Sequence, residues 1–425
     1  MAKARGRKSD LDDRLFWMPS EEEIKNASTT DVYFEYAREA LRFAGINPRV
    51  TMEVFTRKNP HGANWAVVSG VWEVAKLLQG LPVDVDAMEE GEVFLTDSES
   101  AVNEPVLRIT GRYQDFALYE NPLLGFLCQA SGVCTKAARL VDLAQGKMII
   151  GFGTRRVHPA LAPIVERSSI LGGLDSVSNV LGARLMKRSA SGTMPHAFIL
   201  CVGDEAEAWR IFDEALPEEV PRIPLVDTFS DEKFASILAL KTLGRRLYGV
   251  RLDTPTSRRG DMRKLVQEVR WELGLRGGKD VKIIVSGGID EKDVLELRDV
   301  VDGFGIGTSI SAAPVIDFCA KIVEVEDRKT GKMVPRAKRG DLAGRKWVYR
   351  DAQTMSDVVR ARDTPPGKGY APLLKPLIKN GVIVRDFVPL EELRERTLSL
   401  VKKVAASSPA LRWDAGGPQP RAGTS

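Results

Sequence analysis

The stretch from Val281 to Ser309, VKIIVSGGIDEKDVLELRDVVDGFGIGTS, constrains the fold more than any other part of the chain. A strand-like run, VKIIV, stops at a glycine loop, Ser286, Gly287 and Gly288. A segment with helical spacing follows, and a second strand ends in another loop, which holds Gly305, Gly307 and Thr308. The order strand, glycine loop, helix, strand, glycine loop is typical of parallel strands joined by helices.

Two such loops in tandem also predict a binding site. Glycine lets bare backbone N–H groups approach an anion, and a following helix start adds positive field. In α/β barrels the last two strand-to-helix loops commonly bind phosphate. We therefore interpret Ser286, Gly287, Gly288, Gly305, Gly307 and Thr308 as phosphate-binding residues, with ordinary tight turns as the alternative.

The same alternation of strand-like and helix-like runs extends back to Lys147, as in KMIIGFG, PHAFILCVGDEAEAWRIF and LYGVRLD. Units of roughly 30 to 40 residues of this kind are the pattern of βα repeats. They predict an irregular α/β, TIM-like barrel over residues 147–320. An open doubly wound sheet is the structural alternative.

The regions on either side have different patterns. Residues 1–30 are polar and predict an N-terminal arm, while short β-like runs and a few helices over 31–146 predict an α+β sandwich domain on an antiparallel sheet. Its first helix, in TTDVYFEYAREALRFAG, presents Tyr33 in the first turn. Residues 321–425 predict a small α/β extension, whose last stretch, SSPALRWDAGGPQPRAGTS at 407–425, is expected to be a disordered tail.

Composition excludes several classes of protein. The net charge of +4 is spread thinly over 425 residues, so we expect no nucleic-acid partner. No apolar run approaches the roughly 20 residues of a membrane span, and no signal peptide is evident, so we expect a cytoplasmic protein without a membrane partner. The four cysteines lack zinc-ligand spacing and indicate neither structural zinc nor disulfides.

Polar residues follow several of the expected barrel strands, where a barrel carries its chemistry. This candidate set comprises Phe152, Thr154, Arg155, Arg156, His196, Asp227, Arg251 and Asp253. Arginines beside a phosphate loop suit a doubly anionic substrate. Asp227 could hold one nitrogen of His196 and leave the other nucleophilic, and Asp253 could bind a ribose hydroxyl or Mg²⁺. A structural histidine, solvated arginines and a helix-capping aspartate are the alternatives.

Several motifs in fixed order complete the pattern. The runs FGTRRVHP, GGLDSVSNVLGARL and SGTMPHAFIL, with TTDVYFEYAREALRFAG and FTRKNP upstream and YGVRLDT, VSGGID and GFGIGTS downstream, closely resemble nicotinate phosphoribosyltransferases. The resemblance extends from about Thr29 to Tyr349. It implies a type II phosphoribosyltransferase fold in which active sites are shared across a head-to-tail homodimer.

The resemblance also implies an activity. Such enzymes convert nicotinate and phosphoribosyl pyrophosphate to nicotinate mononucleotide and pyrophosphate in NAD biosynthesis, with Mg²⁺ required and ATP hydrolysis coupled to turnover. By residue, Tyr33 matches an aromatic donated by the neighbouring subunit, and Phe152 the other half of a sandwich around the pyridine ring. Arg155 matches a contact to nicotinate or nearby phosphates. His196 matches a transiently phosphorylated histidine, with Asp227 as its orienting acid.

The remaining matches concern the sugar and phosphate end. Arg251 and Asp253 match the pair that flanks the ribose and pyrophosphate, with Asp253 the candidate Mg²⁺ ligand, and the glycine loops match the family's monophosphate loops. The chain departs from longer members, which carry RLDSGD where it has RLDTPTSRRGD, a form associated with short archaeal-type enzymes. Nicotinamide or quinolinate transfer remains the alternative within the family, and a non-catalytic nucleic-acid-binding barrel the alternative outside it.

Overall fold

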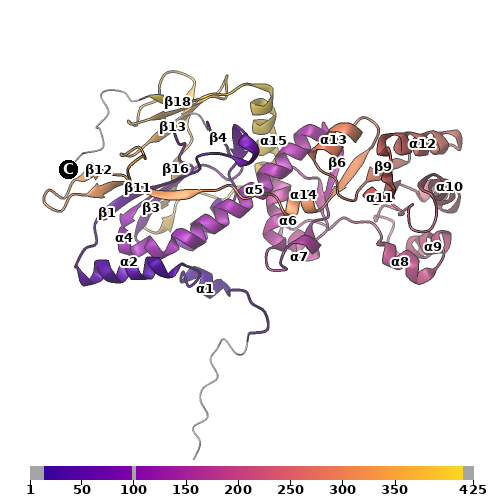
Figure 1. Cartoon of the computed structure of the whole chain (residues 1–425), viewed down its shortest axis with the longest axis horizontal. Helices are drawn as coiled ribbons and strands as arrows, with labels where there is room; N and C mark the ends of the chain where they lie inside the picture. The colour runs from indigo at the N-terminus through magenta and orange to yellow at the C-terminus, as the bar shows by residue number, and fades with distance from the viewer. Residues whose placement is uncertain (1–13, 98–101, 415–425) are drawn as a thin grey trace, which may run out of the picture.

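The computed structural model describes residues 14–97 and 102–414. It has two parts along the long axis of the molecule (Figure 1). One is built on an antiparallel sheet and the other on a parallel sheet with helices around it. Among the described residues no helix is long and apolar enough to cross a membrane.

The antiparallel part is centred on a seven-stranded sheet of order β12-β11-β1-β5-β3-β16-β17. Neighbouring strands of this sheet pair antiparallel, and β1 lies between β11 and β5. Because both faces of β1 are covered, it is buried from its second residue on. The strands are β1 Arg49–Phe55, β3 Val83–Ala87, β5 Leu107–Arg112, β11 Cys319–Glu326, β12 Met333–Pro335, β16 Lys375–Lys379 and β17 Val382–Ile383.

This sheet draws strands from both ends of the chain. Four of them, β11, β12, β16 and β17, come from the region after Phe318, so that region packs as part of the N-terminal unit. The boundaries of the proposed domains themselves remain predictions. Two small sheets pack nearby, formed by β2 Trp65–Val67 with β4 Val93–Leu95, and by β13 Trp347–Asp351, β14 Asp357–Arg360, β15 Tyr370–Pro372 and β18 Leu411–Asp414.

Both predicted ends of the chain can be compared with the structure. Residues 21–25 of the expected arm form α1, which Ser20 and Glu23 close with a capping box. The expected disordered tail is wrong at residues 411–414, because β18 pairs in parallel with β14 and is held by its backbone hydrogen bonds. Residues 1–13 and 415–425 lie outside the described residues.

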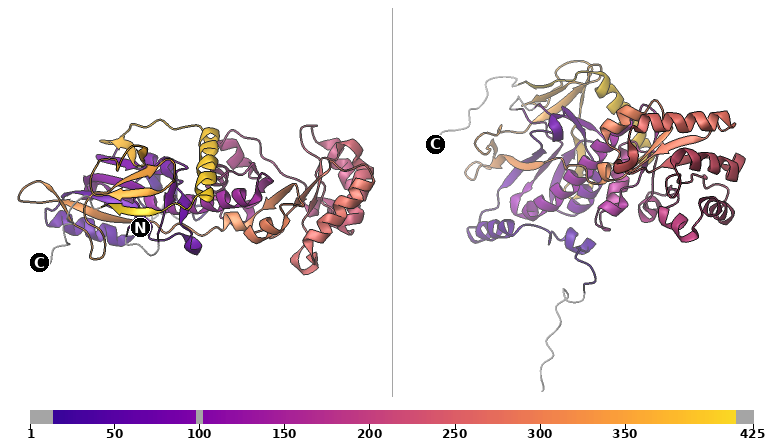
Figure 2. Two further views of the ribbon diagram at one scale, coloured as in Figure 1. Left: turned by 90° about the horizontal axis from the view of Figure 1, so that it is seen from above. Right: turned by 45° about the vertical axis from the view of Figure 1, so that its right-hand side comes forward.

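Helices cover the antiparallel sheet and connect it to the other part (Figure 2). The helix predicted to carry Tyr33 is confirmed as α2 Val32–Phe43. The connecting helix, α5 Glu120–Ala144, packs so closely on the other part that a Cβ on Gly132 would lie 2.4 Å from the carbonyl oxygen of Pro314. The remaining helices of this part are α3 Val71–Leu78, α4 Tyr113–Phe116 and α15 Leu390–Ala406, with 3-10 turns at Pro60–Gly62 and Ala117–Tyr119.

The parallel part confirms the predicted βα repeats. Its strands have the order β7-β6-β10-β9-β8 and all pair in parallel. They are nearly fully buried, as parallel strands covered by helices usually are. Their bounds are β6 Met148–Gly151, β7 Ser176–Val177, β8 Gly249–Leu252, β9 Lys282–Val285 and β10 Gly303–Ile306.

Closure of this sheet into a barrel is not confirmed. Beyond β8, the segment 222–226 adds parallel bridges at Arg222 and Leu225. Beyond β7, the Ser191 N–H donates to the carbonyl of Val177 at 2.9 Å. Among the described residues no backbone hydrogen bond joins segment 222–226 to the chain around Ser191, so the ladder keeps two ends.

Three helices of this part begin at aspartate caps. Asp231, Asp261 and Asp290 accept hydrogen bonds from the first backbone N–H groups of α10, α12 and α13. These caps fix where each loop at the carboxyl edge ends. The helices are α6 Ala162–Leu171, α7 Val180–Leu185, α8 His196–Val202, α9 Glu205–Ala215, α10 Glu232–Leu243, α11 Thr256–Arg259, α12 Met262–Leu275, α13 Glu291–Leu297 and α14 Thr308–Ser311, with 3-10 turns at Thr154–Arg156 and Gly244–Arg246.

Candidate active site

The carboxyl ends of the parallel strands bring most of the predicted residues to one edge. Phe152 follows β6, Asp253 follows β8, Ser286 follows β9 and Gly307 follows β10. Since β6, β10, β9 and β8 are consecutive neighbours in the sheet, the loops after them are neighbours too. The loops after β8 and β9 touch, since Ser286 donates a hydrogen bond to Asp253.

Two of the predicted glycines are required by the backbone or by a close approach, although Gly305 lies within β10 and not in the expected loop after it. Gly287 has a φ of +88°, and a Cβ there would lie 3.2 Å from both the carbonyl oxygen and Oδ1 of Asp253. A Cβ on Gly305 would lie 2.3 Å from the ring of Phe152. Gly288 shares the left-handed backbone, with a φ of +76°. The glycine pattern therefore shapes the edge, whichever ligand it binds.

Ser286 and Thr308 occupy different positions in these loops. Ser286 is buried, and its Oγ donates to Oδ1 of Asp253 at 2.5 Å, so it orients that carboxylate. Thr308 is exposed at the first position of α14. Gly307 lies between, where a Cβ would be 3.1 Å from the carbonyl oxygen of Phe152. Their role in phosphate binding remains a prediction.

His196 and the two aspartates form the charged centre of the edge. Nε2 of His196 lies 3.5 Å from Oδ2 of Asp253 and 3.9 Å from Oδ2 of Asp227. The other ring nitrogen, Nδ1, lies 2.9 Å from Oγ1 of Thr228. The hydrogen bond that orients the imidazole therefore involves Thr228 and not Asp227, whose carboxylate lies beyond hydrogen-bond distance.

Burial shifts the pKa values in this centre. Burial raises the pKa of Asp227, the nearby His196 opposes that rise, and Asp253 adds to it. Oδ1 of Asp227 is buried and has no hydrogen-bond partner among the described residues. Burial lowers the pKa of Arg251, while the carboxylates of Asp253 and Asp227 oppose that effect. A buried acid with an unused oxygen is suited to bind a cation or a donor from a ligand.

Phe152 and the arginines form the adjoining wall. The Arg251 guanidinium lies 5.4 Å from the centre of the Phe152 ring, in cation–π geometry. Arg155 is close enough that its charge also lowers the pKa of Arg251. Arg155 and Arg156 are exposed on the turn after β6. In the same turn, Thr154 donates through Oγ1 to the buried Glu166 at 3.1 Å.

A cavity of about 400 Å³ adjoins this wall. It opens between Phe152 and Arg251 on one side and the loop before His196 on the other. Among the residues that the structure describes, its lining contains one cation and no carboxylate, and consists of Phe152, Ser178, Ala190, Ser191, Gly192, Thr193, Met194, Pro195 and Arg251. A small planar ring with one negative group matches this lining.

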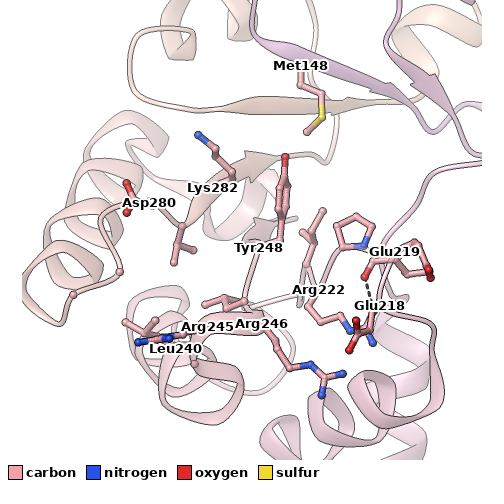
Figure 3. Close-up of a pocket in the computed structure, with 18 of the residues that line it drawn as sticks. Met148, Glu218, Glu219, Arg222, Leu240, Arg245, Arg246, Tyr248, Asp280 and Lys282 are labelled. Carbon is pink, nitrogen blue, oxygen red and sulfur yellow. Dashed lines mark hydrogen bonds between the residues drawn. The ribbon is translucent and has the colours of Figure 1, made fainter.

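A larger cavity, of about 1160 Å³, opens at the amino ends of the same strands (Figure 3). Tyr248, Lys282 and Met148 line it from the strand starts. Most of its cations are already engaged, since Arg222 and Arg246 pair with Asp213, Lys282 with Asp302, and Arg276 with Glu272. Because chemistry in such folds lies at the carboxyl ends, we assign the site to the smaller cavity.

Tyr33 is the one predicted residue that the chain does not bring to this edge. It is 56% exposed on α2, and its ring centre lies 4.4 Å from that of Phe34. Burial and the carboxylates of Asp31 and Glu120 raise the pKa of its phenol. Helix α2 lies against the antiparallel part, far from α8 to α12 in each view (Figures 1 and 2). A role for Tyr33 in this site therefore requires a second subunit.

Three residues at the site escaped the sequence analysis. Thr228 bonds His196, Glu166 bonds Thr154, and the buried Glu232 accepts from Thr254 Oγ1 at 2.9 Å. Glu166 and Glu232 look like ordinary charged positions of amphipathic helices. Only the position of Thr228, directly after Asp227, carried a usable signal.

The sequence and the fold of this chain are similar to those of known proteins. The N-terminal domain model of quinolinate phosphoribosyl transferase matches residues 31–131, and its C-terminal domain model matches residues 133–321. The structure of a nicotinate-nucleotide pyrophosphorylase from Pyrococcus furiosus is 48% identical, with a TM-score of 0.87 over 92% of this chain and 99% of that one. The chain belongs to the type II phosphoribosyltransferase family.

More distant members of the family agree. A nicotinate phosphoribosyltransferase of Mycobacterium tuberculosis is 28% identical over 399 residues, covering 82% of this chain and 84% of its own. The human nicotinic acid phosphoribosyltransferase, at 22% identity and a TM-score of 0.67, covers 88% of this chain and shares its fold. This type II phosphoribosyltransferase is therefore an enzyme of the phosphoribosyltransferase class.

Proposed function

We propose that this enzyme transfers the phosphoribosyl group of phosphoribosyl pyrophosphate to nicotinate, in NAD biosynthesis or salvage. The lining of the cavity beside Phe152 carries the proposal. Its single cation, Arg251, suits one ring carboxylate, whereas the two carboxylates of quinolinate call for a denser set of cations. Nicotinamide would favour a carboxylate acceptor, and none lines this cavity. The name of the Mycobacterium tuberculosis relative gives independent support.

Each group of the two substrates binds a different part of the carboxyl edge of the parallel sheet. The pyridine ring lies against Phe152, and its carboxylate meets Arg251 with Arg155 nearby. The ribose 5′-phosphate binds the glycine loops after β9 and β10 through their backbone N–H groups. Asp253, held by Ser286, accepts from the ribose hydroxyls. The ring nitrogen is thereby held in line with C1 of the sugar.

The reaction forms the bond from the ring nitrogen to C1 and breaks the bond from C1 to the pyrophosphate oxygen. Positive charge develops on the sugar as the pyrophosphate leaves with both electrons of that bond. Alignment of the two partners supplies much of the rate, because an ordered encounter replaces a bimolecular collision. The arginines at the edge stabilise the charge on the leaving group.

The residues present also fit Mg²⁺, the cofactor that the family resemblance implies. Mg²⁺ usually takes one or two protein carboxylates and completes its shell with water and substrate phosphate. Asp253 and Asp227 would hold it, and the buried Oδ1 of Asp227 lacks another partner among the described residues. The described residues contain no group of three or more side chains that could hold a metal ion. When bound, Mg²⁺ would neutralise charge on the pyrophosphate.

We propose that His196 couples ATP to this transfer. With Nδ1 engaged by Thr228, Nε2 is the nitrogen that faces Asp227 and Asp253. Nε2 attacks the terminal phosphorus of ATP, a nitrogen–phosphorus bond forms, and ADP leaves with the electrons of the broken phosphorus–oxygen bond. Nε2 is unprotonated in this step, so the imidazole proton is on Nδ1, which donates a hydrogen bond to Thr228 Oγ1. Attack of water on the phosphohistidine then releases inorganic phosphate and returns the imidazole.

We further propose that the enzyme acts as a homodimer in which Tyr33 of one subunit completes the ring pocket of the other. The exposure of Tyr33 and the distance of α2 from the site support this arrangement. An aromatic ring opposite Phe152 would stack on the free face of the pyridine.

Quinolinate is the second candidate, because the matching family models describe quinolinate phosphoribosyl transferase domains. It carries one carboxylate more than nicotinate and must lose it as carbon dioxide to give the same mononucleotide. Release of carbon dioxide from labelled quinolinate therefore separates the two activities.

The deciding experiment supplies phosphoribosyl pyrophosphate and Mg²⁺ with nicotinate, nicotinamide or quinolinate, each with and without ATP. We expect mononucleotide and pyrophosphate from nicotinate, formed faster with ATP. Turnover of quinolinate or nicotinamide in its place would replace the proposed acceptor. Absence of mononucleotide from all three would overturn the proposed function.

A further inference from the structure

Glu166 lies directly behind the wall of the ring pocket. It sits in α6 and is only 2% exposed. Oε1 accepts the hydroxyl of Thr154 at 3.1 Å, and Thr154 begins the turn that carries Arg155 and Arg156. The buried carboxyl of Glu166 thus anchors this turn through its hydrogen bond with Thr154.

The same side chain also contacts the next loop of the wall. A Cβ on Gly182 of α7 would lie 3.1 Å from Cβ of Glu166, so α7 packs against it closely. Asn179, the cap of α7, accepts from the Gly182 N–H and follows Ser178, which lines the cavity. Glu166 therefore lies between the two elements that form this side of the pocket.

The other oxygen of Glu166 is not used by the protein. Oε2 is buried and has no hydrogen-bond partner among the described residues, and it would lie 3.7 Å from a Cβ on Gly151. A buried carboxylate in this position has no ion-pair partner to stabilise its charge. Accordingly, burial raises the pKa of Glu166 to about 7, although the Thr154 hydroxyl opposes the rise.

No charged group of the described residues contributes to that shift. The cations on the elements around Glu166 are directed elsewhere or exposed. On its own helix, Arg167 pairs with Glu90, and on α15 Arg394 bonds the carbonyls of Gly173 and Leu174. On α5, Lys136 pairs with Glu291 and Arg139 bonds the carbonyl of Trp65. Arg155 and Arg156 on the turn and Arg184 on α7 are exposed.

We propose that Glu166 is a positioning residue for the pyridine carboxylic acid that the enzyme consumes, called the ring acid below. Through Thr154, Glu166 fixes the turn that presents Arg155 to the carboxylate of this substrate. This inference rests on the proposed function. Ionised Glu166 places a negative charge behind the pocket, and that charge weakens binding of an anionic ring. The neutral form does not, so affinity for the ring acid falls as pH rises through 7.

The test compares Glu166→Gln, Thr154→Val and wild type from pH 6 to pH 8.5, with whichever ring acid the wild type consumes. In wild type we expect the KM for the ring acid to rise several-fold over this range. In Glu166→Gln the amide oxygen still accepts from Thr154, so KM starts near the wild-type value and stays flat. In Thr154→Val the turn loses its anchor, so we expect KM to rise about tenfold with kcat within about twofold.

The KM for phosphoribosyl pyrophosphate serves as the internal control and should stay within about twofold in both variants. A merely structural role would change both KM values and kcat together, and would leave the pH profile of Glu166→Gln parallel to wild type. Parallel profiles, or an unchanged KM in Thr154→Val, would overturn the proposal.

A ligand-free measurement keeps this inference separate from the proposed function. The pKa of Glu166 is higher in the folded chain than in the unfolded chain, so the folded chain retains a proton that the unfolded chain has lost. The stability that Glu166 contributes is fully present below the ordinary glutamate pKa and is lost as pH rises through about 7. The urea midpoint should therefore fall more between pH 5 and pH 8 in wild type than in Glu166→Gln. Equal falls would contradict a buried neutral Glu166, whatever substrate the enzyme uses.

Discussion

At the scale of single residues, a difference of about one ångström separates a hydrogen bond from a purely electrostatic contact in this site. His196 contacts Thr228 at hydrogen-bond distance, while Asp227 lies at 3.9 Å and acts only through its charge. Gly305 leaves room for the Phe152 ring that a side chain would take. Two predictions follow from these contacts.

The first concerns His196. If Nε2 is the phosphoryl acceptor, His196→Ala should lose the stimulation by ATP and keep a slow ATP-independent transfer, because the binding groups for both substrates remain. Mononucleotide formation with and without ATP measures this. His158→Ala, at an exposed histidine, is the matched control and should respond to ATP as wild type does. Undiminished stimulation in His196→Ala would remove His196 from this role.

The second concerns Gly305. In Gly305→Ala the new methyl group would lie 2.3 Å from the Phe152 ring, so the ring must leave its place in the pocket wall. We expect the KM for nicotinate to rise about tenfold or more, with a smaller change for phosphoribosyl pyrophosphate. Gly125→Ala in α5 is the control, since nothing lies within 4 Å of its Cβ. A normal KM for nicotinate in Gly305→Ala would show that Phe152 does not contact the ring.

At the scale of elements, the long-range pairing of the antiparallel sheet is reinforced by buried charge. Lys346, just before β13, pairs with Glu53 of β1 at 2.7 Å, and both side chains are almost fully buried. The Lys346 N–H also donates to Glu53 Oε1 at 2.8 Å. This pair joins segments that are distant in sequence, so it helps to fix the C-terminal region against the central strand.

Removing one partner of this ion pair should lower the free energy of unfolding. Lys346→Met leaves Glu53 buried without its counter-ion, which destabilises a protein by about 3 to 5 kcal/mol. Lys379→Met, on the same sheet at a half-exposed pair with Asp86, is the matched control and should cost at most about 1 kcal/mol. Urea unfolding followed by tryptophan fluorescence compares the two. Adding Glu53→Gln to Lys346→Met should recover part of the loss, and equal effects of the two lysine variants would contradict this account.

At the scale of the whole molecule, the two parts of the chain carry different halves of the proposed pocket. The parallel part supplies Phe152, Arg251 and His196, whereas Tyr33 lies on the antiparallel part. A single chain cannot bring them together, because α2 and the carboxyl edge are far apart in the fold. A head-to-tail pair of subunits would place each α2 at the partner's site.

Mixing two variants with different defects, assayed at low nicotinate with ATP, tests this arrangement. Tyr33→Ala should raise the KM for nicotinate, and His196→Ala should lose the ATP stimulation. Reassembled together, hybrid dimers contain one site with both defects and one site with neither. Random mixing should therefore restore about a quarter of the ATP-stimulated activity. Separately treated variants combined only in the assay are the control, and no recovery after reassembly would place Tyr33 outside the shared site.

Much of the site could be predicted from the sequence because its elements are local. Buried strands followed by glycines mark the loops after β9 and β10, and Phe152, Arg251 and Asp253 are recognised by their positions at strand ends. Parallel strands then bring those ends to one edge whatever the details of packing. The partners Thr228, Glu166 and Glu232 could not be predicted in this way, because each depends on which helix packs behind which loop.

The sequence by itself determined the parallel strands, the glycine loops and the residues at their ends, since periodicity and backbone freedom are properties of short segments. Three features became visible only in the folded chain. Strands β11 and β16 complete the N-terminal sheet, and β18 forms a strand in part of the expected tail. The parallel sheet has two edges that no backbone hydrogen bond joins among the described residues. The tertiary structure also decided that Glu166 lies buried beneath Thr154. These features depend on pairing between distant segments, and the free energy of that pairing is set by burial and hydrogen bonding that no local pattern records.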